Sequence, residues 1–289
     1  MLDYNTVRNW DFGEVLQSRA VRDTLLYACS IGFGADPVHP GELRFAYEES
    51  LQTIPTMACV LGSPGFWWQD PRTGVDSLKV VHAAEDVRLF SSLPASGVVR
   101  AHNRVLSITD RGPQNGAMAV ILRELFEHNS GERLAEVRTL SCLRGDGGFS
   151  LQSGVSDPLP ERLPAVPQRA ADVEVELQST AQQALLYRLN GDYNALHADP
   201  DVARAAGFPK PILHGLCTFG MAAHAVLKGI VDCDAARIRR VAARFTAPVF
   251  PGDRLRFQLW RQPQGVVHLC ARVDGRDAVV LDNGVVELS

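Results

Sequence analysis

Alternating apolar and polar positions mark two sets of expected strands, one in each half of the chain. The alternation runs through eight segments, which are residues 79–90, 97–108, 116–127, 133–143, 239–249, 253–262, 265–273 and 278–288. Turn-forming Pro and Gly residues separate them, as at Pro94 and Gly97 and again at Pro251 and Gly252. A period of two residues is typical of strands with one buried face. The pattern therefore predicts an antiparallel sheet in each half.

A helical period precedes the strands. It is clearest from Gly215 to Lys228, where Leu216, Phe219 and Ala223 fall near one stripe. One long helix followed by antiparallel strands predicts an α+β layer arrangement in each half, with the sheet wrapped around the helix. The alternation of strand and helix that builds a parallel sheet is missing, and so is a glycine-rich phosphate loop after a strand.

The two halves resemble each other. The tripeptide LLY at residues 25–27 recurs at 185–187, and IPTMACV from Ile54 is answered by ILHGLCT from Ile212. Self-similarity on this scale indicates duplication of a whole fold. Between the halves, Gly145 to Arg169 is rich in Gly, Pro and Ser and has no apolar period, so it is interpreted as a linker. We expect a first repeat at 1–144, a linker at 145–169 and a second repeat at 170–289.

Composition narrows the class of protein only slightly. Of 289 residues, 46% are hydrophobic and 21% charged, and the net charge is −4. This balance gives no overall basic field for nucleic acid or an anionic membrane. The six cysteines form no CxxC pair, which favours reduced thiols. No signal-peptide pattern and no apolar run of about 20 residues is present, so we expect a soluble cytoplasmic protein.

Candidate chemistry is densest in YRLNGDYNALHADP, from Tyr187 to Pro200. Gly191 signals a turn and the helical period stops there, so the segment is expected to be a loop. Asp192 and His197 supply a carboxylate and an imidazole, which can hold one water and pass its protons. Asn194 lies between them and offers both an amide donor and an acceptor.

The second candidate is PILHGLCTFG, from Pro211 to Gly220, where an extended run becomes the long helix. The backbone N–H of Gly215 would be among the free donors of the helix N-terminus. Such a donor suits a thioester oxygen that gains negative charge in an enolate-like transition state. Glycine at this point lets a substrate approach the backbone closely.

Structural interpretations compete with these. Asp199 with Pro200 fits the cap of a short helix through Ala206, and His214 fits a residue that fixes the turn before the long helix. Asp192 and Asn194 are residue types common in turns. His197 and Asp199 form an HxD pair, but no further metal ligand has convincing spacing, so no metal is expected. Trp67 and Trp68 fit a packing corner better than a stacking platform, although their loop could reach a pocket.

Together the two segments resemble the hydratase 2 motif of the MaoC-like dehydratases, Y-R-L-S-G-D-x-N-P-L-H-x-D-P followed by G-F-x-x-P-I-L-H-G-L-C-T-x-G. The matching positions are Tyr187, Arg188, Leu189, Gly191, Asp192, Asn194, Leu196, His197, Asp199, Pro200, Gly207, Phe208 and Pro211–Gly220. The first half is also similar to the family's non-catalytic half. The resemblance covers nearly the whole chain and implies a double hotdog fold, with each sheet wrapped around a long central helix.

The resemblance implies hydration of trans-2-enoyl-CoA to the (3R)-3-hydroxyacyl-CoA. Asp192 and His197 would hold the catalytic water, Asn194 would orient the site, and the Gly215 amide would polarise the thioester carbonyl. Lys210 and Arg244 are candidates for contacts with the coenzyme A phosphates. No metal or redox cofactor is implied, coenzyme A being the substrate's carrier, and a homodimer is expected.

The sequence departs from the family motif at two positions, and two other functions remain as alternatives. Asn190 replaces a small hydroxyl residue and Ala195 replaces proline, which bears on efficiency and substrate range. No equivalent Asp–Asn–His set occurs in the first half, which is therefore expected to be a wall of the substrate pocket. The alternatives are an acyl-CoA thioesterase of the same fold and a non-catalytic acyl-thioester-binding subunit.

Overall fold

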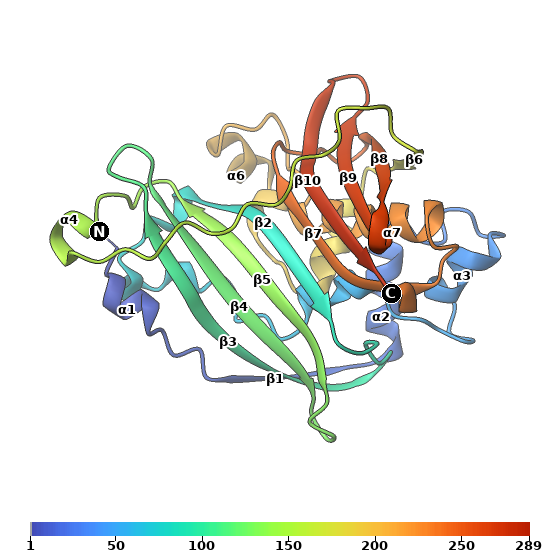
Figure 1. Ribbon diagram of the computed structural model, residues 1–289, viewed down its shortest axis with the longest axis horizontal. Coiled ribbons are helices and arrows are strands. Elements are labelled where there is room, and N and C mark those ends of the chain that lie inside the picture. Colours follow the sequence, from blue (N-terminus) through green and yellow to red (C-terminus); the bar gives the residue numbers. More distant parts are fainter. Residues whose placement is uncertain (1) are drawn as a thin grey trace.

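The computed structural model describes residues 2–289 and contains one curved antiparallel sheet of ten strands (Figure 1). The strands are β1 Glu14–Arg19, β2 Val80–Leu89, β3 Gly97–Asp110, β4 Ala117–Glu127, β5 Arg133–Leu143, β6 Val173–Gln178, β7 Ile238–Phe245, β8 Arg254–Gln262, β9 Val266–Val273 and β10 Ala278–Leu288. All eight strands expected from the alternation are present.

The order of the strands shows the duplication directly. The sheet runs β1-β3-β4-β5-β2-β7-β10-β9-β8-β6. Counted from its own outer edge, each half therefore has the order first, third, fourth, fifth, second. The halves join where β2 pairs antiparallel with β7, with Val87 opposite Val241. This single seam makes two five-stranded sheets continuous.

The two strands that the alternation did not predict, β1 and β6, are the edge strands of the sheet. Each is six residues long, and along each most side chains are exposed or half-buried. Burial on one face produces the alternation that marks a strand, and these edges have little of it. Their pairing with β3 and β8 defines them instead.

Helices lie on the concave side of the sheet and at its ends. The α-helices are α1 Tyr4–Arg8, α2 Val21–Ser30, α3 Pro40–Ala46, α4 Ser150–Ser153, α5 Gln183–Tyr187, α6 Pro200–Ala205 and α7 Gly215–Gly229. The 3₁₀ turns are η1 Pro55–Val60, η2 Trp67–Gln69, η3 Pro71–Thr73, η4 Ser77–Lys79, η5 Arg188–Asn190, η6 Ala195–His197, η7 Ala235–Arg237 and η8 Pro263–Gly265.

Helix α7 is the central helix expected from the sequence. Every residue from Cys217 to Leu227 is buried, so the helix is enclosed on all sides. Gly220 makes this possible, because a Cβ there would lie 2.7 Å from the Cγ2 atom of Ile31, the residue that follows α2. The main core joins α7 to both halves of the sheet.

The first repeat differs from the expectation of a long central helix. The counterpart of α7 is η1, a 3₁₀ turn of six residues from Pro55 to Val60. Proline at its first position suits a helix start, but Gly62 and Pro64 follow at once and end the apolar period. The second half therefore supplies the only long helix in residues 2–289, and both halves of the sheet curve around it.

The segment between the repeats crosses the face of the sheet opposite α7 (Figure 1). After α4 it contains no helix or strand up to β6. It is attached to both halves, because the carboxylate of Asp157 accepts from the backbone N–H of Ile108 on β3 and the carbonyl of Leu163 accepts from Asn283 on β10.

Trp67 and Trp68 pack in a second, smaller core around α1. Their rings stack with centroids 3.9 Å apart, and Trp67 also contacts Trp10 and Phe12. This core shares no residue with the one around α7. The packing interpretation of the two tryptophans is confirmed, and a place beside the α7 site is not supported.

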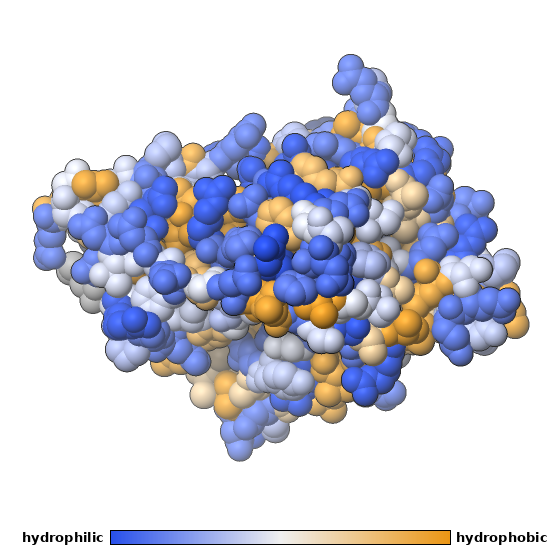
Figure 2. Space-filling view, turned by 90° about the horizontal axis from the view of Figure 1, so that it is seen from below, coloured by the Kyte–Doolittle hydropathy of each residue, from blue (hydrophilic) through white to orange (hydrophobic). Residues whose placement is uncertain are grey.

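Polar side chains cover much of the face seen in Figure 2, where apolar residues form several separate groups. Among the helices of residues 2–289, none combines the length and the apolar character that crossing a membrane requires.

Candidate active site

The loop after α5 is shaped by its own polar side chains. The carboxylate of Asp192 accepts from the backbone N–H of Asn194 at 3.2 Å, and the Oδ1 atom of Asn194 accepts from the N–H of Leu196 at 3.1 Å. The second bond caps η6, the turn that carries His197. Asn194 is exposed, and its side chain orients this loop by bonding to the loop's own backbone. The expected cap at Asp199 is confirmed, since its carboxylate accepts from two N–H groups of α6.

His197 is buried and held in one tautomer. Its side chain lies 2.9 Å from the carbonyl oxygen of Ile212, measured from Nδ1. A carbonyl can only accept, so Nδ1 carries the proton and Nε2 is left with a lone pair. Burial lowers the pKa of His197, and the Ile212 carbonyl and the charge of Asp192 oppose this without reversing it. The neutral imidazole is therefore favoured, with Nε2 able to accept a proton.

His214 lies directly against His197. The two rings stack with centroids 3.8 Å apart, and the Nε2 atom of His214 donates to the backbone carbonyl of Asp192 at 3.2 Å. Burial, and then the proximity of His197, lower the pKa of His214 to about 4. The structural interpretation of His214 is confirmed, since the residue fixes the Asp192 loop. It also belongs to the site, which the sequence did not indicate.

Gly215 begins α7, directly after His214. The His214 carbonyl accepts from the N–H groups of Cys217 and Thr218, whereas the N–H of Gly215 has no acceptor within residues 2–289. A Cβ on Gly215 would lie 3.2 Å from the ring of Phe245 on β7. The free amide therefore stands at the positive end of a buried helix, beside an aromatic wall.

Side-chain atoms of Asp192, His197 and His214 all lie within 4.8 Å of one another. This distance lets Asp192 and His197 hold one water between them. With the Gly215 amide at the start of the adjoining helix, the arrangement offers a proton acceptor, a proton donor and a donor to a developing oxyanion. The sequence motif thus assembles in space, and His214 completes it.

The same three residues are the group within residues 2–289 that could coordinate a metal ion. The two nitrogens that remain for a ligand are Nε2 of His197 and Nδ1 of His214, and the latter is buried without a partner in this part of the chain. A zinc site needs three or four such ligands. The set therefore has the minimum number, with Asp192 and His214 beside His197 in place of the Asp199 of the HxD pair.

The two expected phosphate contacts differ in their position. Lys210 is exposed on the segment that leads to Gly215, and its Nζ lies 3.3 Å from the carbonyl of Pro251. Arg244 is exposed on β7 directly before Phe245, which packs on α7. Successive side chains of a strand point to opposite faces, so Arg244 lies on the face away from Gly215. This arrangement does not favour Arg244, and the contact of Lys210 with the phosphates stays a prediction.

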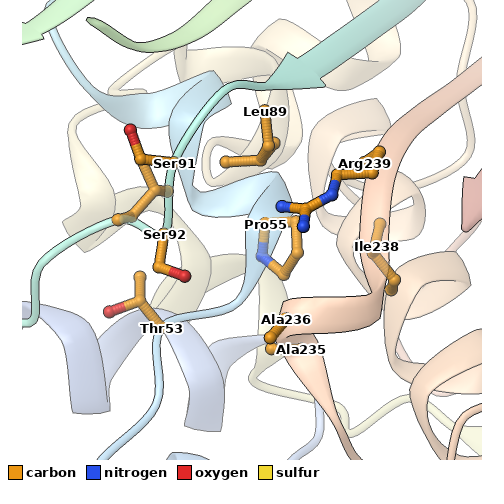
Figure 3. Close-up of a pocket in the computed structure, with 10 residues that line it drawn as sticks. Thr53, Pro55, Leu89, Ser91, Ser92, Ala235, Ala236, Ile238 and Arg239 are labelled. Atoms are coloured by element: carbon orange, nitrogen blue, oxygen red, sulfur yellow. The ribbon is translucent and has the colours of Figure 1, made fainter. Parts of the chain in front are cut away.

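A small cavity of about 20 Å³ lies elsewhere, between the end of β2 and η7 (Figure 3). Thr53, Ser91 and Ser92 line one side, and the guanidinium of Arg239 extends toward Pro55 on the other. Its volume is about that needed for one water. None of the candidate catalytic residues lines it, so it is separate from the site.

Comparison with protein families divides the chain as its topology does. Residues 18–145 match the MFE-2 hydratase 2 N-terminal domain, and residues 162–281 match the MaoC like domain. The 3-hydroxyacyl-thioester dehydratase Y of Mycobacterium tuberculosis is 39% identical over 275 residues, which are 92% of this chain and 91% of that protein. The enoyl-CoA hydratase ChsH3 of the same organism is 37% identical, over 90% of this chain and 89% of that protein.

Solved structures of MaoC-like and MFE-2 proteins also superpose on this chain. A MaoC-like dehydratase from Phytophthora capsici superposes with a TM-score of 0.84 at 29% identity, over 99% of this chain and 98% of that one. Peroxisomal multifunctional enzyme type 2 from Drosophila melanogaster gives 0.81 at 31% identity, over 96% of this chain and 48% of that one.

The ten-stranded sheet around one long helix, with its repeated strand order, is a double hotdog fold. With the matches to both of its halves, the chain belongs to the MaoC-like hydratase 2 family.

Proposed function

We propose that this protein is a hydro-lyase that reversibly hydrates trans-2-enoyl-CoA to 3-hydroxyacyl-CoA. The observation that carries the proposal is the grouping of Asp192 and His197 within 4.8 Å beside the free amide of Gly215. Relatives named as enoyl-CoA hydratases and as a 3-hydroxyacyl-thioester dehydratase support it. The fold alone would not support a hydratase over other enzymes, because an acyl-ACP thioesterase from Bacteroides thetaiotaomicron also has this fold, at a TM-score of 0.55 and 12% identity.

In the proposed reaction, Asp192 and His197 hold the water and Gly215 binds the thioester oxygen. The water oxygen bonds to C3 while the Asp192–His197 pair takes one proton from the water and delivers one to C2. The pair thus ends in its starting protonation state, and the elements of water have been added. Negative charge that develops on the thioester oxygen is stabilised by the Gly215 amide and the N-terminal end of α7.

The acyl group would enter the first repeat. That half lacks a second Asp–Asn–His set, and the short η1 replaces its central helix. Both features suit a wall for the acyl chain. Lys210 is proposed to meet the coenzyme A phosphates, as a point charge on the exposed side of the site. Coenzyme A serves as the substrate's carrier, with no other cofactor.

The test is hydration of crotonyl-CoA, followed through the loss of absorbance of the enoyl thioester. The product is expected to be the (3R) alcohol, because the Asp–His loop and the Gly215 amide keep the family's spacing. Dehydrogenases of known handedness, coupled to the reaction, measure this. Release of free thiol in place of hydration would identify a thioesterase, and binding without turnover a non-catalytic subunit. Sedimentation velocity would test the expected homodimer.

A further inference from the structure

A second histidine–carboxylate pair lies on β2, in the repeat that lacks the catalytic motif. The Nε2 atom of His82 lies 2.9 Å from Oε2 of Glu85. The side chain of Glu85 is only 1% exposed, whereas that of His82 is 31% exposed. A carboxylate so deeply buried fixes the imidazole firmly, and the imidazole reaches solvent.

The pair exists because β2 is irregular at this point. In a regular strand, residues three apart point to opposite faces of the sheet. The register of β2 against β5 shifts between His82 and Ala84, which brings His82 and Glu85 to the same face. Bulges of this kind often re-aim a side chain beside an active site.

The bulge directs His82 toward the candidate active site. Its ring meets that of Phe245 edge-on, with centroids 4.7 Å apart and planes at 62°. Phe245 lies on the neighbouring strand β7 and packs against Gly215. The two strands form the seam between the repeats (Figure 1). His82 therefore stands one aromatic ring away from the amide that is proposed to bind the thioester.

The chemistry of the pair defines what it can bind. Because the carboxylate of Glu85 accepts, Nε2 of His82 donates, and Nδ1 is left with a lone pair. No hydrogen bond within residues 2–289 uses that atom. A fixed acceptor of this kind suits an N–H donor. The carrier arm of an acyl thioester has one close to the sulfur, in its cysteamine amide.

The exposure of the two residues decides which part of the substrate His82 meets. Glu85 lies on the interior side, beside the buried thiol of Cys59, whose pKa is raised by burial and then by the carboxylate. His82 lies on the solvent side of the same pair. The acyl group is buried during the proposed reaction, and the carrier arm leads out to solvent. The half-exposed imidazole is thus placed for the arm.

We propose that His82 binds the carrier arm of the substrate, with its Nδ1 atom accepting from the cysteamine amide N–H, and that Glu85 is the positioning residue that holds the imidazole. The inference rests on the proposed hydratase function and assigns a role in it to the repeat without the catalytic motif.

The experiment compares two small crotonyl thioesters on the full chain. One is the N-acetylcysteamine thioester, and the other is the S-(4-oxopentyl) thioester, in which CH₂ replaces the amide N–H. The wild-type protein should prefer the first in kcat/KM by about threefold to tenfold, the worth of one hydrogen bond. In His82→Phe, which keeps a ring against Phe245 but has no acceptor atom, the ratio should fall to about one. Glu85→Leu should lower it in the same direction.

His102→Phe is the matched control. His102 also lies near a glutamate, Glu14 at 3.8 Å, and meets an aromatic ring edge-on, but both residues of that pair are about half exposed and lie on β1 and β3. Its ratio should equal that of the wild type. An unchanged ratio in His82→Phe would overturn the inference alone. A wild-type chain that hydrates no enoyl thioester would overturn the proposed function and this inference with it.

Discussion

The imidazole rings of His197 and His214 stack with centroids 3.8 Å apart and planes at 29°. Two charged imidazoles at this distance would repel each other strongly, and both rings are almost fully buried. Each is therefore neutral near pH 7, consistent with pKa values below the ordinary 6.5. Backbone carbonyls hold one nitrogen of each ring, so the stack fixes the position of the proposed proton acceptor.

Removing either member of the Asp192–His197 pair is expected to abolish most activity. Loss of a positioned acid or base typically costs about 10²–10⁴-fold in rate, so Asp192→Asn and His197→Ala should each lower kcat of crotonyl-CoA hydration by that factor. Asp199→Asn is the control in the same motif, because asparagine can still cap α6. Near-normal turnover in either of the first two variants, with circular dichroism unchanged, would contradict the assignment.

The buried imidazoles predict a dependence of stability on pH. His214 has a pKa of about 4 when folded, against about 6.5 when unfolded. Between these values the unfolded chain binds more protons, so the free energy of unfolding falls as the pH drops from 6.5 to about 4. His214→Gln, which can still donate to the Asp192 carbonyl, should show a shallower fall. Urea unfolding at pH 7, 6 and 5 measures the difference in slope, and equal slopes would contradict it.

Chelation tests the group Asp192, His197 and His214 for a metal. Because three of the six side-chain nitrogen and oxygen atoms of this group already form hydrogen bonds with backbone groups, we expect the residues to act in proton transfer. Dialysis against EDTA should leave kcat unchanged, and added Zn²⁺ should inhibit by occupying the pair. Loss of activity on dialysis, with recovery on adding one equivalent of a metal, would assign a metal-dependent mechanism.

Buried charge elsewhere also gives a measurable prediction. Glu42 on α3 accepts from Lys228 at 2.6 Å and lies 3.5 Å from His224 on α7, which joins the repeats. Burial alone would raise its pKa, but the proximity of His224 and the hydrogen bond from Lys228 outweigh this and lower it to about 2. The stabilisation is present above pH 4.5 and is lost as the pH falls toward 2.

Glu42→Gln removes that charge and should lower the free energy of unfolding at pH 7 by about 1.5–3 kcal/mol. The difference in the free energy of unfolding between the wild type and Glu42→Gln should become smaller between pH 4.5 and pH 3, because the wild-type carboxylate becomes protonated as the pH falls. Chemical denaturation at several pH values measures it. If this difference in free energy stayed constant across the range, the ion pairs of Glu42 would not be its cause.

The fold was predictable wherever one face of an element is buried. The strands from Val80 to Leu143 and from Ile238 to Leu288 carry the alternation, and α7 carries an apolar period, because burial imposes both. The edge strands β1 and β6 do not show this alternation, because neither buries one whole face. The long central helix expected in the first repeat is absent, because Gly62 and Pro64 follow η1 and end the apolar segment.

The candidate site was predictable only where its residues are close in sequence. Asp192, Asn194 and His197 fall within six positions, so their types and spacing indicate shared chemistry. His82 and Glu85 reach the same region through a bulge and through the pairing of β2 with β7. Neither feature leaves a sequence pattern, since pairing across the seam is a property of the folded sheet.

Two glycines of α7 separate function from stability in the last prediction. Gly215→Ala places a methyl group 3.2 Å from Phe245, at the point where the thioester must approach the amide. The neighbouring ring can yield by a few tenths of an ångström, and alanine favours a helix, so stability should change little. The value of kcat/KM should nevertheless fall at least about tenfold, since displacing a reacting group by an ångström typically costs about 10²-fold.

Gly220→Ala should lower stability and leave activity nearly unchanged. Its methyl group would lie 2.7 Å from Ile31 and 3.1 Å from the hydroxyl of Tyr27, both enclosed in the core between the repeats. Overpacking of this kind costs about 1–3 kcal/mol. Thermal unfolding should therefore show a lower Tm for Gly220→Ala, with activity per folded molecule close to the wild type at 25 °C. If Gly215→Ala lowered Tm as much as Gly220→Ala and left kcat/KM unchanged, the Gly215 amide would be a structural helix start and not the group that binds the thioester.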